Sequence, residues 1–171
     1  MLKMKWILIL SALISSLANA DLNFEIRHTD LKYKWGDKAD FPLKMVQAGF
    51  NYNKNGFSIG VIGGESDKRT SRGPWVLPIE LENFFTLTVA QDIKINNKLS
   101  LFIGATYSEY KEVVNGEAKP DTGNGTVYGL KYKAFQDMTI KLSADKYYQK
   151  NSKSIGLETT DGFGVSLLFD F

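Results

Sequence analysis

The residues best suited to enzyme chemistry lie in the segment His28-Thr29-Asp30, which holds the only histidine of this 171-residue chain. Acyl transfer needs a base beside its nucleophile and a third group that orients the base. Neighbouring residues on a strand point to opposite faces, so Thr29 and Asp30 cannot both face the histidine. No serine lies near His28 in the sequence either. We therefore predict a non-enzymatic protein, with a lipid-modifying enzyme as the alternative.

A second group of chemically capable residues is a cationic loop at residues 66–77. It carries Lys68, Arg69 and Arg72 close to Trp75. Clustered cations next to an aromatic ring could contact the phosphates of lipopolysaccharide or another anionic partner. The alternative is an ordinary solvated turn. A later segment, residues 112–124, is predicted to be a flexible loop of mixed charge that could present a recognition surface.

A third group consists of ionisable residues inside segments that alternate apolar and polar side chains. Isolated buried charges are costly, so these side chains are expected to pair with one another or with trapped water. We predict a structural charge network, with a narrow conduit or a small ligand cavity as the alternatives. The residues of this predicted network are Glu25, Arg27, Glu80, Glu82, Lys131, Lys133, Lys141 and Asp145.

The elements that would position these residues are strands, because apolar residues recur at every second position. Each segment is about 9–11 residues or longer, enough to cross a hydrocarbon layer while tilted. In the first segment the apolar row changes parity, which predicts a bulge near 28–30. The eight predicted strands lie near 22–35, 42–53, 56–66, 78–93, 98–111, 125–134, 138–149 and 161–171.

The last segment has the clearest alternation in the chain. An apolar row faces small or polar residues on the other side, and the chain ends on an aromatic residue. The members of this row are Phe163, Val165, Leu167, Phe169 and Phe171. The pattern predicts a strand whose apolar face meets lipid.

Residues 1–20 have the three parts of a secretory signal peptide. Lys3 and Lys5 precede an apolar run, and Ala18-Asn19-Ala20 forms a small-residue cleavage site. We predict cleavage before Asp21 and one domain over 21–171. Cleavage leaves 19 basic and 19 acidic residues, so charge does not favour nucleic acid as a partner. The absence of cysteine excludes disulfides and cysteine-based metal sites, and we expect no metal and no cofactor.

Tight turns near 54–55, 96–97 and 136–137 alternate with long polar connections. This alternation is typical of an all-β, up-and-down antiparallel transmembrane barrel with periplasmic turns and extracellular loops. With its terminal row ending Leu167-Leu168-Phe169-Asp170-Phe171, the chain resembles the small eight-stranded outer-membrane barrels of the OmpX/Ail-like or opacity-protein-like families.

This resemblance implies a place in the outer membrane of a Gram-negative-type bacterium. It also implies that the terminal row is the signal recognised by the barrel-assembly machinery. The expected partners are outer-membrane lipid, lipopolysaccharide and a surface or host ligand, and a monomer is expected. The expected role is envelope integrity or surface interaction, including adhesion, through the extracellular loops. A narrow channel for small solutes is a further alternative.

Overall fold

The computed structural model describes residues 21–35, 39–70, 78–149 and 159–171. The predicted signal peptide lies outside the described residues. The described part of the chain is built from strands: β1 Asp21–Trp35, β2 Ala39–Lys54, β3 Phe57–Ser66, β4 Arg69–Thr70, β5 Pro78–Lys94, β6 Leu99–Val114, β7 Glu117–Phe135, β8 Met138–Gln149 and β9 Thr159–Asp170.

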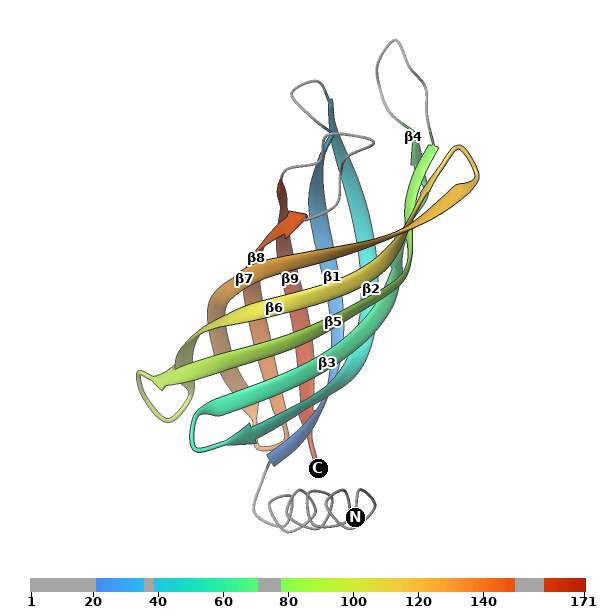
Figure 1. Cartoon of the computed structure of the whole chain (residues 1–171). Helices are drawn as coiled ribbons and strands as arrows, with labels where there is room; N and C mark the ends of the chain where they lie inside the picture. Colours follow the sequence, from blue (N-terminus) through green and yellow to red (C-terminus); the bar gives the residue numbers. More distant parts are fainter. Residues whose placement is uncertain (1–20, 36–38, 71–77, 150–158) are drawn as a thin grey trace, which may run out of the picture.

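The strands form one closed antiparallel barrel (Figure 1). Each long strand pairs with its neighbours along the chain, β1 pairs with β9, and β3 pairs with β5. The two-residue strand β4 adds only the pairs Arg69–Ile79 and Thr70–Pro78 against β5. Eight long strands therefore make the barrel, as predicted, and closure leaves no free sheet edge around it.

Two ends of the barrel can be distinguished. The turn end carries the connections 55–56, 95–98 and 136–137. Phe171 also lies at this end, where its backbone N–H donates to the Leu22 carbonyl at 3.2 Å. At the opposite end, called the loop end, β1 ends at Trp35, β3 ends at Ser66, β8 ends at Gln149, and the turn 115–116 joins β6 to β7. Parts of the loop end fall outside the described residues.

The alternation read from the sequence matches the barrel's two faces. Val46 is 62% exposed whereas the next residue, Gln47, is 1% exposed. The predicted outer rows on β3, β6, β7 and β9 likewise expose large apolar side chains, among them Ile59, Ile103, Tyr128 and Phe163. A barrel with apolar side chains outside and polar ones inside suits a lipid surround, because lipid cannot hydrogen-bond. The predicted fold class is confirmed.

Two Asn-Gly turns join strands with matching geometry. Asn55-Gly56 has φ angles of 53° and 80°, and Asn115-Gly116 has 53° and 85°. Two-residue turns with positive φ at both positions match the twist of an antiparallel pair. The predicted loop at 112–124 is therefore wrong. β6 and β7 stay paired up to Val114–Glu117 and form a ribbon, called here the β6–β7 ribbon (residues 111–122).

The predicted bulge in the first strand is also wrong. β1 keeps one register against both β2 and β9 from end to end. The register shift lies instead in β5, between Glu82 and Phe85, where Asn83 has a φ of 51°. It changes the parity of that strand: Ile79 and Leu81 are buried before the shift, and Phe84 and Thr86 after it.

Leu31, the first apolar residue of the changed parity in β1, faces inward because the barrel's interior changes character along its axis. Toward the loop end, the interior is an apolar cluster, called here the loop-end core: Leu31, Leu43, Met45, Ile79, Leu81, Phe84, Tyr110 and Tyr147. The outer face at the same level carries exposed polar residues such as His28, Asp30, Lys32 and Lys44. This half has the polarity of a water-soluble protein, as expected where strands extend past the hydrocarbon layer.

Candidate functional site in the barrel interior

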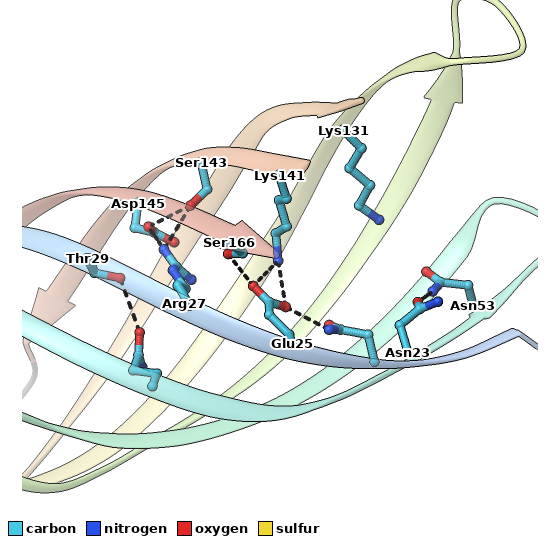
Figure 2. Close-up of polar contacts among 12 residues, drawn as sticks. Asn23, Glu25, Arg27, Thr29, Asn53, Lys131, Lys141, Ser143, Asp145 and Ser166 are labelled. Carbon is cyan, nitrogen blue, oxygen red and sulfur yellow. Dashed lines mark hydrogen bonds and ion pairs between the residues drawn. The ribbon is translucent and has the colours of Figure 1, made fainter. Parts of the chain in front are cut away.

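A polar network crosses the middle of the barrel, and Glu25 is its centre. The Glu25 carboxylate is fully buried and accepts hydrogen bonds from three other strands (Figure 2). The Lys141 ammonium donates to both carboxylate oxygens at 3.1 Å. Ser166 Oγ donates at 2.6 Å and Asn51 Nδ2 at 2.6 Å. β1, β2, β8 and β9 are thereby joined through one negative charge.

Arg27 lies two residues further along β1, on the same inner row. Its guanidinium is 2% exposed, donates to Ser143 Oγ at 2.9 Å and forms an ion pair with the Asp145 carboxylate. Gly164 on β9 leaves the space that this side chain occupies, because a Cβ there would lie 2.6 Å from Arg27 Nε. The pair holds β1 against β8 without burying an unpaired charge.

A third group of charges surrounds the Phe102 ring. The ammonium groups of Lys131 and Lys141 each lie 5.4 Å from the ring centroid. Lys131 also donates to both oxygens of Asp92, at 2.8 and 2.7 Å. Gly129 admits the ring, since a Cβ there would lie 2.9 Å from Phe102 Cε1. Cation–π contacts and ion pairs together hold two lysines in the lumen.

The remaining residues of the predicted network lie elsewhere. Glu80 and Glu82 alternate with the buried Ile79 and Leu81, so they lie on the outer row, and the prediction for them is wrong. The bulge in β5 is the reason, because it reverses the parity that the sequence suggested. Lys133 lies at the turn end, half exposed, with its ammonium 3.7 Å from Asp170.

Side chains fill the loop-end half and the middle of the barrel's interior. The loop-end core blocks one half, and the Glu25 and Arg27 clusters occupy the middle. Toward the turn end a cavity of about 750 Å³ remains, called here the turn-end cavity. Its lining residues include Asn23, Asn53, Lys54, Asp92, Lys94, Lys98, Ser100, Lys131, Lys133 and Thr139. An eight-stranded barrel is narrow enough for side chains to close it.

His28 is not part of this interior. It lies on the outer surface, where its Nε2 atom is 3.4 Å from Asp30 Oδ1, and both side chains are about half exposed. Thr29 points inward and is fully buried, with its Oγ1 donating to Gln47 Oε1 at 3.2 Å. The hydroxyl that neighbours the histidine in the sequence is therefore on the opposite side of the sheet. Within the described residues, no group of three His, Asp or Glu side chains is placed to hold a metal ion.

The predicted cationic loop is described only in part. Lys68 is exposed, with its ammonium 3.7 Å from Glu80 Oε1, and the backbone of Arg69 belongs to β4. Arg72 and Trp75 lie outside the described residues. The apolar terminal row of β9 faces outward: Phe163, Val165 and Leu167 are exposed, Phe169 is half buried, and Phe171 is exposed beyond the strand.

The sequence does not show how the inner residues combine. Asn51, Ser143 and Asp92 have the right parity for the inner face, but parity does not say which partner each one meets. Ser166 on β9 is 141 residues from Glu25 and still donates to it. The antiparallel registers of β1 with β9 and of β8 with β9 bring these rows together.

Comparisons with known proteins support the fold. No protein-family model and no curated protein matches this chain. Among solved structures, neisserial surface protein A is 11% identical over 89% of this chain and 97% of its own, with a TM-score of 0.68. The attachment invasion locus protein Ail of Yersinia pestis is 14% identical over the same shares, with a TM-score of 0.51. A second Ail structure, in complex with the heparin analogue sucrose octasulfate, is 12% identical with a TM-score of 0.51. The chain thus has the fold of small eight-stranded outer-membrane barrels.

Proposed function

We propose that residues 21–171 form a monomeric, non-enzymatic barrel in the outer membrane of a Gram-negative-type bacterium. Export by the signal peptide 1–20 and recognition of the terminal row of β9 by the barrel-assembly machinery would bring it there. Its function is contact with anionic surface molecules at the loop end, in support of envelope integrity or adhesion. The observation that carries this proposal is the closed middle of the barrel, because without a passage through the lumen the loop-end surface is the part that can meet molecules outside the cell.

The exterior supports the membrane location. Large apolar side chains such as Ile103 and Phe135 are about 60% exposed or more. Each such side chain gains roughly 1.5–3 kcal/mol when it is fully removed from water, so a band of them strongly favours lipid. The part of the chain that the structure describes holds no helix long and apolar enough to cross a membrane.

The loop end supports contact with anions. Lys44 and Lys68 are exposed there, and the cationic loop adds Arg69 and Arg72 in sequence. The β6–β7 ribbon projects beside this region (Figure 1). Tyr110 donates to Asp121 at 3.3 Å across the base of the ribbon. The Ail complex with a sulfated sugar shows that a barrel of this fold can be crystallised with a polyanion, which supports the same ligand class here.

The test compares cells that display the wild-type barrel with cells that display Lys68→Gln/Arg69→Gln/Arg72→Gln. We expect binding to a heparin column to fall in the triple variant and to weaken with salt, because surface charges are screened. The control, Lys111→Gln/Lys119→Gln, removes two cations of the β6–β7 ribbon and should retain binding. Equal retention of wild type and triple variant would contradict the proposed surface.

The enzyme alternative is tested separately. We expect the mass spectrum of lipid A to be the same from cells with and without the gene, since the buried Thr29 hydroxyl cannot reach His28. A gene-dependent mass change would refute the non-enzymatic assignment. For the channel alternative, planar-bilayer recordings should show no steady conductance, and discrete openings would refute the filled interior.

A further inference from the structure

The turn-end cavity has a charge that the polar network does not explain. Five lysines line it: Lys54, Lys94, Lys98, Lys131 and Lys133. Asp92 is the only acidic residue in the same described lining. Five ammonium groups around one cavity repel one another and attract anions, more strongly where surrounding protein limits the access of water.

Among the described residues, two of these lysines have acidic partners. Lys131 is held by both oxygens of Asp92, and Lys133 lies 3.7 Å from Asp170. Within the part of the chain that the structure describes, the side chains of Lys54, Lys94 and Lys98 have no ion pair or hydrogen bond. Three positive charges at the cavity mouth are therefore uncompensated.

The cavity mouth is held by backbone contacts between strands and turns. The Asp92 N–H donates to the Gly56 carbonyl at 2.6 Å, and the Lys133 N–H donates to the Lys98 carbonyl at 2.8 Å. Asn96 Oδ1 accepts from the backbone N–H groups of Lys98 and Leu99, at 2.8 and 2.9 Å. These bonds place the lysine-bearing turns before any ligand arrives, which lowers the ordering cost of binding.

The cavity lies inside the barrel wall and is closed on the side that faces the loop end. Asn23, Asp92 and Lys131 come from the inner rows of β1, β5 and β7, and the Glu25–Lys141 pair lies further in. A ligand would enter from the turn end and stop at this layer. A soluble molecule suits that position better than a lipid in the bilayer, because the strand wall separates the lumen from the lipid-facing surface.

We propose that the turn-end cavity binds a soluble anion that carries phosphate groups. A phosphate offers several acceptor oxygens and more than one negative charge, so it can meet ammonium groups from several turns at once. A single carboxylate would engage fewer of them. With the loop end at the cell surface, as the proposed function requires, this cavity opens to the periplasm. The binding itself does not depend on that orientation.

The experiment measures binding of inorganic pyrophosphate to the folded barrel in a zwitterionic detergent by titration calorimetry. The test variant is Lys54→Gln/Lys94→Gln/Lys98→Gln, which replaces the three exposed lysines that have no acidic partner among the described residues. The matched control is Lys32→Gln/Lys111→Gln/Lys119→Gln, which replaces three exposed lysines toward the opposite end. Heat-dependent gel mobility checks that all three proteins are folded.

We expect the wild type and the control to bind with similar affinity and the test variant to lose about tenfold or more. Added salt should weaken binding. No measurable binding by the wild type, or equal affinity in the test variant, would overturn the proposal. A second measurement uses the barrel in phosphatidylcholine nanodiscs with and without phosphatidylglycerol. If pyrophosphate binds only when the anionic lipid is absent, a lipid headgroup occupies the cavity, and the soluble ligand is refuted.

These outcomes are independent of the heparin-column test of the loop end. The lysines at the cavity mouth and Lys68 of the cationic loop lie at opposite ends of the barrel. Loss of one kind of binding therefore leaves the other intact, and the two proposals can fail separately.

Discussion

Replacing Glu25 by Gln tests whether the polar network stabilises the barrel. All the side chains around this carboxylate donate hydrogen bonds to it: the Lys141 ammonium, the Ser166 hydroxyl and the Asn51 amide. A glutamine has nearly the same shape but brings an NH₂ group toward these donors. It also leaves Lys141 buried without its counter-ion.

The expected loss in free energy of unfolding is large for the replacement of one carboxylate oxygen by an NH₂ group. Removing one partner of a buried ion pair costs about 3–5 kcal/mol, because the remaining charge is left uncompensated. With a dependence of about 2 kcal/mol per molar urea, the unfolding midpoint should fall by about 2 M. The matched control on the same strand is Asp30→Asn, which removes an exposed carboxylate 3.4 Å from His28 and should cost less than about 1 kcal/mol.

The assay is urea unfolding of the barrel in phosphatidylcholine vesicles, followed by the fraction that runs as the folded band on an unheated gel. Lys141→Met and the double variant complete a cycle. The double variant should be more stable than the sum of the single changes implies, by about 2 kcal/mol, since neither charge is then left alone. If Glu25→Gln costs no more than Asp30→Asn, or if the two changes are additive, the network does not stabilise the barrel.

Three further predictions concern the glycines and the last residue. Gly129→Ala should lower the unfolding midpoint and the refolding yield, because its Cβ would overlap the Leu142 carbonyl and approach Phe102 Cε1 to 2.9 Å. The control Gly63→Ala, whose Cβ would lie 3.7 Å from the nearest atom, should refold normally, and equal yields for the two variants would contradict the packing argument. Gly116 has open space around it but a φ of 85°, so an alanine there should add a local strain of about 1–2 kcal/mol. This strain should speed amide exchange in the β6–β7 ribbon and leave the unfolding midpoint of the barrel unchanged, and unaltered exchange in the ribbon would refute it. Deleting Phe171 should reduce the amount of barrel assembled in the outer membrane without lowering refolding in detergent, and a normal level in cells would count against the assembly signal that we propose.

The sequence predicted the barrel well because its main signal is local. Side chains alternate between faces at every second residue, so Val46, Phe50 and Gln47 reveal their faces without any tertiary information. The short turns have local signals as well, and Asn115-Gly116 is itself a hairpin dipeptide. That dipeptide favours the β6–β7 ribbon over the predicted loop.

The errors have two physical causes. Alternation extended back from Phe85 puts Glu80 and Glu82 inside, but one extra residue near Asn83 reverses the parity of β5, and a bulge has no clear signature in a polar stretch. Leu31 mimics the sequence pattern of a bulge, because it is an apolar residue on the inner row of a strand whose earlier apolar residues face outward. The outward placement of apolar residues holds only where lipid surrounds the barrel, and Leu31 belongs to the loop-end core.

The sequence by itself determined that this chain forms strands with one apolar and one polar face, because the two-residue alternation of a strand is visible in the sequence of that strand alone. Only the tertiary structure decided which polar residues meet. Lys141 is 116 residues from Glu25, and the closure of β1 against β9 brings them to 3.1 Å. Register is set between strands rather than within one, so the pairing inside the lumen and the lysines gathered at its mouth emerge only when the barrel closes.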